Sequence, residues 1–384
     1  ARSRARGRPG GPAGRRPDRG SIADFPGGTG GRARTASHIL PRMMKIVISG
    51  GGIVGLTLAR LLRLRGFEPV VFERMPAGAY QPRGYMMGFQ GYPPLEEVGV
   101  LDEVRAQGWD IAPRPDGSAV AVCVEVGRLI GALARDLPVV YEHTVQELAR
   151  DGSGRVVGVV AEGPGGRTAY ESDLVVACDG VGSPVRAMAG LEAKVEPLAE
   201  ASLNFMGPGI LETSFAMNYL SDGGHIGCLG WPQGSAGWRS CEKVGAEAAL
   251  APGLEAIKEM WARLLPESEP GVRALTSLDQ VRYSEPQLLS CPEWWTPGVV
   301  IIGDAAHFFG PETGVSSGLG MGDAHALAEA VRQNPDDPDA ACASYVTWRA
   351  PVIRPYEATD PGRQRMVLAG NVEPRPEERW PPPD

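Results

Sequence analysis

Three glycines and one carboxylate have the types and the spacing that bind a dinucleotide. The segment Gly50-Gly51-Gly52-Ile53-Val54-Gly55 has the pattern GxGxxG, and Glu73 follows 23 positions after Gly50. Gly50 permits a tight turn, Gly52 lets the backbone approach a pyrophosphate, and Gly55 lets a helix pack close to a strand. A carboxylate at the distance of Glu73 accepts hydrogen bonds from ribose hydroxyls and disfavours a 2′-phosphate. We therefore expect FAD or NAD, rather than NADP, as the resident dinucleotide.

The residues around this motif predict the elements that must position it. The run Lys45-Ile46-Val47-Ile48-Ser49 is typical of a buried parallel strand. Residues 56–65 have one apolar helical face, and residues 69–72 form a second apolar run that ends at Glu73. The glycine turn therefore precedes a helix whose free N–H groups and dipole attract phosphate. The alternative is an ordinary βαβ unit with a glycine-rich turn.

Two later strand ends carry motifs that identify the dinucleotide. The predicted strand 174–178 is followed by Asp179-Gly180, and the predicted strand 299–302 is followed by Gly303-Asp304. In this order, GxGxxG, DG and GD resemble the motifs of the group A flavoprotein monooxygenases, the para-hydroxybenzoate hydroxylase-like family. The resemblance covers about residues 43–350. It implies an α/β fold, with an antiparallel-sheet α+β substrate domain inserted into a Rossmann-like FAD-binding domain.

The resemblance also implies roles for individual residues. Glu73 would hold the adenosine ribose, and Arg74 would lie along the adenine. Asp304 would accept hydrogen bonds from the ribityl chain of FAD. Asp179-Gly180 resembles the motif that the family links to both FAD and the nicotinamide donor. Arg128, which opens a predicted helix, would touch the flavin, and a solvated arginine is the alternative.

A glycine-rich segment at residues 314–324 leads into another predicted helix. We expect its first residues, Gly314, Val315 and Ser316, to lie at the pyrimidine edge of the flavin, where the helix dipole favours negative charge. Pro311, in the loop before them, belongs to the same expected cofactor-binding set. Ser316 departs from the family, which usually has glycine at this position. The alternative is a helix whose small residues only pack tightly.

The middle of the chain has no nucleotide motif and is expected to bind the substrate. Alternating segments at 214–220 and 225–229 predict antiparallel strands, and residues 254–265 predict one amphipathic helix. In the family, a sheet here covers the flavin and lines an aromatic pocket. The candidate pocket residues are Met217, Tyr219, His225, Trp231 and Trp238. Core packing or a loop position is the more frequent role for each residue type.

The reaction is implied by the resemblance, because no Ser/His/Asp or Cys/His constellation stands out in the chain. NADPH or NADH would reduce FAD, and reduced flavin would react with O₂ to give a C4a-hydroperoxide. This species would hydroxylate an aromatic small molecule, phenolic or polyketide-like, as in secondary metabolism. No catalytic base is identified. A second GxGxxG is absent from the sequence, so the nicotinamide donor is expected to bind transiently.

Three other functions can be compared with this one. A flavin-dependent halogenase would need an early lysine and a WxWxIP motif, yet no lysine occurs between Lys45 and Lys194. An FAD-dependent reductase of the geranylgeranyl-reductase kind would keep much of the same framework. A non-catalytic FAD-binding partner protein remains a third alternative.

Composition limits the partners and the compartment. Ten Arg and two Asp give residues 1–42 a net charge of +8, and the rest of the chain has 28 basic and 44 acidic residues, or −16. An acidic body argues against nucleic acid as a partner. The six cysteines lack metal-ligand spacing and indicate a reduced, cytoplasmic environment. No apolar run is long enough for a membrane span, and we expect a monomer or homodimer without a metal.

The domain boundaries follow from these segments. We expect a disordered basic leader at 1–42, because this segment is rich in Gly, Pro and Arg. The FAD-binding domain is expected at 43–190 and again, with C-terminal helices, at 291–360. The substrate domain would occupy 191–290, and a flexible Pro-rich tail 361–384.

Overall fold

The computed structural model describes residues 43–80, 83–113, 119–222, 224–310 and 314–357. The chain divides into one unit at residues 1–41 and another at residues 42–384. The first unit and the C-terminal segment from residue 358, where the leader and the tail are expected, lie outside the described residues.

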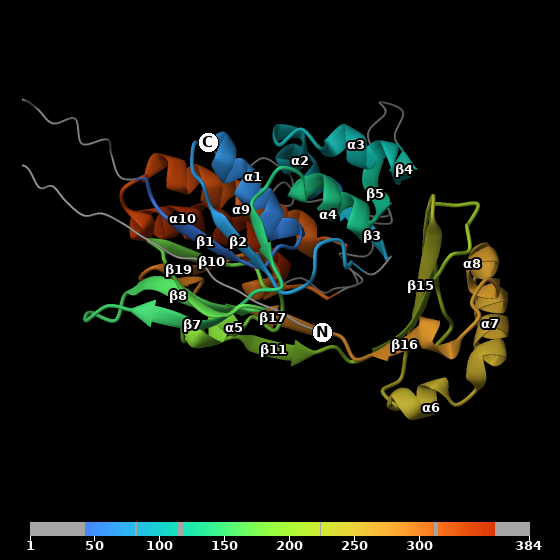
Figure 1. Cartoon of the computed structure of the whole chain (residues 1–384). Coiled ribbons are helices and arrows are strands. Elements are labelled where there is room, and N and C mark those ends of the chain that lie inside the picture. The colour runs from blue at the N-terminus through green and yellow to red at the C-terminus, as the bar shows by residue number, and fades with distance from the viewer. Residues whose placement is uncertain (1–42, 81–82, 114–118, 223, 311–313, 358–384) are drawn as a thin grey trace, which may run out of the picture. The chain divides into compact units, whose positions relative to one another are not determined.

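A six-stranded sheet forms the centre of the part that is expected to bind FAD (Figure 1). Its strands are β18-β19-β10-β1-β2-β6 in spatial order, and all neighbours are parallel except β18 and β19. The bounds are β1 Ile46–Ser49, β2 Val70–Glu73, β6 Val139–Tyr141, β10 Leu174–Ala177, β18 Trp295–Thr296 and β19 Val299–Ile301. Every residue of β1, β10 and β19 is buried, as expected for parallel strands covered on both faces.

Two layers cover this sheet. One layer contains α1 (Ile53–Leu64), α9 (Ser316–Gln333) and α10 (Pro338–Glu357), and α9 packs against both of the others. The other layer is a three-stranded antiparallel sheet of β7 (Thr144–Arg150), β8 (Val156–Gly163) and β9 (Gly166–Glu171). Figure 1 shows the helices on one side of β1 and β2, and β7 and β8 on the other.

A small sheet and three helices lie beside α1. The sheet has the order β3-β5-β4, with β3 Gly84–Gly88, β4 Trp109–Pro113 and β5 Ala119–Glu125. The helices are α2 (Tyr92–Glu97), α3 (Leu101–Ala106) and α4 (Val126–Ala134).

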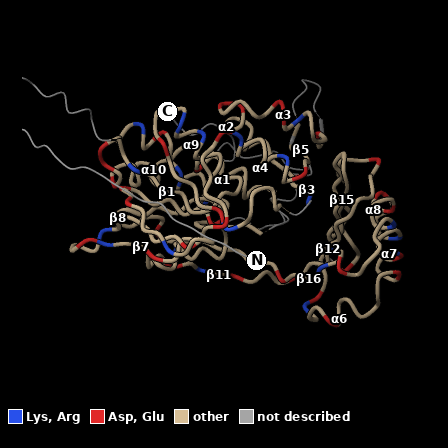
Figure 2. Tube along the Cα trace, in the orientation of Figure 1, with Lys and Arg blue, Asp and Glu red and all other residues tan. Residues whose placement is uncertain are grey.

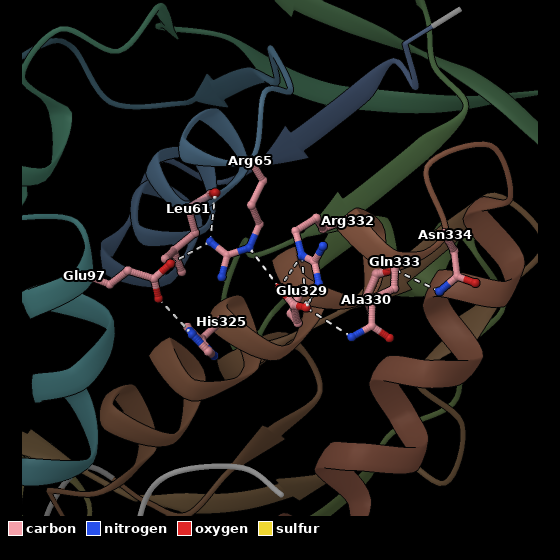
Figure 3. A network of polar contacts seen from close by, with 9 residues as sticks. All are labelled: Leu61, Arg65, Glu97, His325, Glu329, Ala330, Arg332, Gln333 and Asn334. Carbon is pink, nitrogen blue, oxygen red and sulfur yellow. Dashed lines mark hydrogen bonds and ion pairs between the residues drawn. The ribbon is translucent and has the colours of Figure 1, made fainter. Parts of the chain in front are cut away.

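Polar contacts connect α1, α2 and α9 (Figure 3). Arg65, just after α1, forms ion pairs with Glu97 of α2 at 2.8 Å and with Glu329 of α9 at 3.4 Å. His325 of α9 contacts Glu97 at 2.8 Å, and Arg332 contacts Glu329 from the next turn of its own helix. We call these residues the Arg65 network.

The second large sheet is antiparallel and has the order β13-β14-β15-β12-β16. Its strands are β12 Ala201–Gly207, β13 Phe215–Tyr219, β14 His225–Trp231, β15 Gly234–Cys241 and β16 Val281–Ser284. One face packs against α7 (Gly253–Leu264) and α8 (Glu269–Arg273), where Trp261 meets Phe205 edge-on at 5.2 Å. The short helix α6 (Ala246–Leu250) lies beside β16. The other face meets β4 and β5 through an apolar cluster that includes Ile111, Cys123 and Trp231.

A three-stranded sheet connects the two parts. It has the order β11-β17-β20, with β11 Lys194–Pro197, β17 Gln287–Ser290 and β20 His307–Phe308. The chain therefore enters and leaves the second large sheet through paired strands. The α/β fold class expected from the sequence is confirmed, with a parallel Rossmann-like sheet and a separate antiparallel sheet.

Two further features are the distribution of the charged residues and the hydropathy of the helices. Figure 2 shows acidic and basic residues interspersed along the described chain. Across the residues that the structure describes, none of the helices combines the length and the apolar character that crossing a membrane requires.

Candidate cofactor and substrate site

The glycine turn after β1 is crowded on one side and open on the other. Gly50 has φ +109°, and a Cβ placed on it would lie 2.4 Å from the carbonyl oxygen of Cys178. A Cβ on Gly55 would lie 2.0 Å from the carbonyl oxygen of Gly50. A Cβ on Gly52, in contrast, would meet no described atom within 4 Å. The backbone at Gly52 is therefore approachable, which fits a pyrophosphate.

Helix α1 begins immediately after this turn. Its N-cap is Gly52, no side chain caps it, and its first turn contains no acidic residue. The N–H groups of its first turn therefore remain available to an anion. Val54 in the same turn packs within 3.2 Å of the Cβ position of Gly303 and 2.7 Å of that of Gly320. Val54 thus joins the glycine turn to the GD motif and to α9.

Glu73 lies at the end of β2 and is buried. One of its carboxylate oxygens accepts the N–H of Gly51 at 2.8 Å, and the other accepts the N–H of Met75 at 2.8 Å. The carboxylate therefore fixes the glycine turn, and it retains lone pairs for ribose hydroxyls. Arg74, beside it, is exposed.

Arg128 is the third residue of α4 and is exposed. Its guanidinium donates to the side-chain oxygen of Gln107 at 3.1 Å. Gln107 follows α3, so this contact connects two helices of the small β3–β5 region. The structure therefore places Arg128 against α3 and not in the group of contacts around the glycine turn.

The DG motif follows β10, next to β1. The carboxylate of Asp179 lies 3.5 Å from the hydroxyl of Ser49 and accepts the N–H of Val185 at 3.3 Å. Burial raises the pKa of Asp179, although hydrogen bonds from Ser183 and Val185 oppose this. Its Oδ1 atom is buried and has no hydrogen-bond partner among the described residues. Gly180, with φ +87°, turns the chain away after this carboxylate.

The GD motif follows β19, the neighbour of β10. Gly303 has φ +59°, and Asp304 occupies the short 3₁₀ turn Gly303–Ala305. The carboxylate of Asp304 accepts no hydrogen bond from the residues that the structure describes. Burial raises its pKa to about 6, while His307 and Arg83 act in the opposite direction. Asp304 is therefore an acceptor with unused capacity, as a ribityl-binding carboxylate must be.

Helix α9 starts close to Asp304. Gly314 has φ +63°, and Val315 and Ser316 at the helix start are buried. The hydroxyl of Ser316 accepts the N–H of Phe309 at 3.2 Å, so this side chain connects the start of α9 to the residue that follows β20. That contact gives the hydroxyl of Ser316 a structural partner at this position. Pro311 lies outside the described residues.

Strand β3 connects the α9 side of the site to the second large sheet. Tyr85 donates its hydroxyl hydrogen to Ser317 of α9. Burial raises the pKa of this phenol, and the charge of Asp304 raises it further. The opposite face of β3 carries Gly84, and a Cβ placed on this glycine would lie 2.2 Å from the ring of Trp231. The two faces of one strand therefore touch α9 and β14.

An apolar cluster lies between β4, β5 and the second large sheet. We call it the Trp231 cluster. Its buried members are Ile111, Ala121, Cys123, Leu229, Trp231 and Trp238, and Met86, Met206, Phe215, Met217 and Ala236 pack against them. None of these eleven described side chains is charged. The indole N–H groups of Trp231 and Trp238 are buried without a partner among the described residues.

The five candidate pocket residues occupy different positions. Met217, Trp231 and Trp238 belong to the Trp231 cluster. Tyr219 lies two residues after Met217 on β13 but is 55% exposed. His225 pairs with Tyr219 in the sheet and is buried, and its backbone N–H donates to Ser240 at 2.7 Å. The structure thus brings Met217 and Trp231 together and places Tyr219 and His225 farther along the sheet.

Sequence reasoning missed Tyr85 and Ser317 on the α9 side of β3. The alternation of Tyr85, Met86 and Met87 was the available signal, since alternate residues of a strand point to opposite faces. It also missed Phe215, which shares a face with Met217 for the same reason.

Comparison with known proteins agrees with this geometry. The family model described as "FAD binding domain" matches residues 43–112 and 129–356. The chain is 27% identical to 2-heptyl-3-hydroxy-4(1H)-quinolone synthase of Mycobacteroides abscessus, over 85% of this chain and 90% of that protein. It is also 27% identical to 3-amino-4-hydroxybenzoate 2-monooxygenase of Streptomyces cremeus, over 82% and 85% of the two chains.

A solved structure shows the same fold. The tetrameric form of 2-methyl-3-hydroxypyridine-5-carboxylic acid oxygenase superposes with a TM-score of 0.70 at 19% identity, over 86% of this chain and 94% of that chain. The family model covers well over half of the sequence and includes all three motifs. The resemblance drawn from those motifs is therefore confirmed, and the chain belongs to the FAD-binding domain family of the flavin-dependent aromatic monooxygenases.

Proposed function

We propose that the protein hydroxylates an aromatic small molecule, phenolic or polyketide-like, with FAD as cofactor, O₂ as oxidant and NADPH or NADH as electron donor. One observation carries this proposal. Three separate strand ends bring an approachable glycine backbone at Gly52, an orphan carboxylate oxygen of Asp179 and the unused carboxylate of Asp304 to one end of one sheet. Ligands of open α/β sheets bind at the carboxyl ends of the strands.

Each part of the cofactor has residues that suit it. Glu73 and Arg74 would hold the adenosine, and the backbone from Gly52 to Gly55 would bind the pyrophosphate. Asp304 would accept the ribityl hydroxyls, and Gly314, Val315 and Ser316 would lie along the flavin ring. Asp179 and Gly180 would serve both FAD and the nicotinamide donor. Arg128 would have to leave Gln107 to reach the flavin.

The substrate ring would lie against the Trp231 cluster. This cluster is apolar and aromatic, so it favours a flat, weakly charged ring. The indole N–H groups of Trp231 and Trp238 would donate to an oxygen substituent, since a buried donor without a partner costs about 1–3 kcal/mol. Tyr219 and His225 would lie toward the rim. The names of the two relatives, which refer to a quinolone and a hydroxybenzoate, are consistent with an aromatic substrate.

Bound FAD supplies the electron transfer and the oxygen activation that no side chain can supply. The chain has to orient the ring and exclude water around it. The aromatic and methionine side chains of the Trp231 cluster would do both, and Tyr85 would hold the start of α9 through Ser317. No side chain is assigned as catalytic base.

Purified full-length protein tests the proposal. We expect it to bind FAD and to oxidise NADPH or NADH faster when phenols or quinolones are added, with one atom of ¹⁸O₂ entering the product. Asp304→Ala removes the carboxylate proposed to accept the ribityl hydroxyls and should weaken FAD binding. Protein that retains no yellow flavin after it is mixed with FAD and unbound FAD is removed would reject the proposal. Reduction of the added compound without ¹⁸O uptake would indicate the reductase alternative, and FAD binding without any turnover would indicate a partner protein.

A further inference from the structure

One carboxylate behind the GD motif is completely buried and has three partners. Asp323, in the middle of α9, is 0% exposed. Its Oδ2 atom accepts the backbone N–H of Gly303 at 3.0 Å and lies 2.7 Å from Nε2 of His307. Its Oδ1 atom accepts from Nε of Arg349 at 2.8 Å. The carboxylate thus joins the end of β19, the start of β20, α9 and α10.

The charge of this carboxylate is compensated inside the protein. Arg349 of α10 is 1% exposed and also donates to the carbonyl oxygen of Leu319 at 3.0 Å. Burial acts to raise the pKa of Asp323, but His307 and Arg349 outweigh it and hold this pKa below its ordinary value. An ionised group buried this deeply is retained only with such partners, because leaving one of them out is strongly destabilising.

The position of these contacts links them to the cofactor site. Gly303 has a positive φ and immediately precedes Asp304, so its N–H fixes the direction of the turn that presents Asp304. Asp323 also lies on the helix whose first residues are expected at the flavin ring. We propose that Asp323, held by Arg349, is a positioning residue for FAD, because it fixes the position of the Gly303–Asp304 turn relative to α9. This inference rests on the proposed role of Asp304.

The chain contains a matched comparison for this arrangement. Asp339, in the first turn of α10, forms an ion pair with Arg155 and accepts the backbone N–H of Gly298 at 3.2 Å. Gly298 also has a positive φ, and it lies just before the opposite end of β19. Asp339 therefore has the same kinds of partner as Asp323, an arginine and a glycine N–H, but at the end of the strand away from the GD motif.

Asp323→Asn and Asp339→Asn provide the test in the full-length protein. The Kd for FAD is measured by equilibrium dialysis, thermal stability by circular dichroism, and the flavin environment by visible circular dichroism at saturating FAD. We expect both variants to lose stability. Only Asp323→Asn should raise the Kd for FAD, by about tenfold or more, and change the visible spectrum. Asp339→Asn should keep the Kd within about twofold.

Arg349→Lys keeps the protein testable if Asp323→Asn does not fold. It retains the positive charge but loses the second donor to Leu319, and we expect a smaller rise in the Kd for FAD with a nearly intact fold. Equal Kd values in the Asp323 and Asp339 variants, or a wild-type Kd in Arg349→Lys beside an unfolded Asp323→Asn, would overturn the inference. Asp304→Ala separates the two proposals, since an unchanged Kd there would refute the cofactor site itself.

Discussion

At the scale of single residues, Asp304 carries opposing requirements for stability and for binding. Its pKa is raised to about 6 by burial, so the folded protein favours the neutral carboxyl more than the unfolded chain does. The stability that this group contributes is therefore fully present below its ordinary pKa of 3.8 and is lost as the pH rises through about 6. A cofactor hydroxyl, in contrast, bonds best to the ionised form.

Asp304→Asn should therefore separate stability from binding. We expect the FAD-free variant to be more stable than the wild type at pH 8, by up to about 3 kcal/mol. The difference should disappear near pH 4, and FAD affinity should fall at both pH values where it can be measured. Urea denaturation at a series of pH values and FAD titration check this. A stability difference that does not depend on pH would contradict the assignment.

Trp238 allows a second test at this scale. Trp238→Phe keeps an aromatic ring in the Trp231 cluster but removes an unpartnered indole N–H. We expect the KM for an aromatic substrate with an oxygen substituent to rise about tenfold, with little change in FAD affinity. Trp261→Phe makes the same chemical change on the opposite face of the sheet and should leave the KM unchanged. Equal KM values in the two variants would remove Trp238 from the substrate site.

At the scale of elements, Gly52 and Gly55 at the start of α1 differ in the free space around them. Gly52→Ala adds a methyl group where no described atom lies within 4 Å, so the fold should remain intact, within about 1 kcal/mol. The methyl group should nevertheless obstruct the pyrophosphate and weaken FAD binding tenfold or more. Gly55→Ala directs its methyl group at the carbonyl of Gly50 and should cost about 3 kcal/mol or more. Thermal denaturation measures the stability of both variants, and FAD titration measures their affinity. A destabilised Gly52→Ala would contradict the expectation that its fold remains intact.

The Arg65 network holds three helices together (Figure 3). Arg65 is largely buried and contacts Glu97, Glu329 and the carbonyl of Leu61, so Arg65→Ala should cost about 1–2 kcal/mol. Arg332→Ala is the control, because its pair with Glu329 is exposed and lies within one helix, and it should cost less than about 0.5 kcal/mol. Urea denaturation at pH 7.5 compares them, and equal losses would show that the connection between helices contributes nothing.

The positions of the first site elements could be predicted from the sequence, because short-range patterns specify them. The strand expected at 45–49 is found at 46–49, and Glu73 ends β2 as expected. The helix expected at 56–65 is found at Ile53–Leu64, because the glycine turn ends at Gly52, which is the N-cap. The FAD family also followed from these motifs and is confirmed.

Contacts between distant segments could not be predicted in this way. Asp323 and Arg349 look like ordinary surface residues in the sequence, yet both are buried, because each is the partner that permits the other. Ser317 and Trp231 contact opposite faces of β3 only because α9 and the second large sheet pack on the two sides of that strand. Their proximity depends on tertiary packing and leaves no local pattern.

At the scale of the whole molecule, two hydrophobic cores support two parts of the proposed reaction. The core around Trp261 lies under the second large sheet, whereas the core of the parallel sheet is separate. Trp261→Ala should cost about 3–5 kcal/mol and should raise the KM for the aromatic substrate more than the Kd for FAD. Steady-state kinetics and FAD titration below the unfolding temperature measure the two effects. A parallel rise in both values would show that the cores act as one.

The two-sided contact of β3 has a consequence for how such a protein can diverge. Tyr85 and Gly84 are adjacent in the chain, so a displacement of the indole of Trp231 pushes on the same backbone that anchors Ser317. If the substrate and the flavin bind as proposed, enlarging the side of β3 that faces Trp231 without disturbing the side that faces α9 requires a compensating change within the five residues Gly84–Gly88. New specificity in this scaffold should evolve through paired substitutions, one of them in this strand.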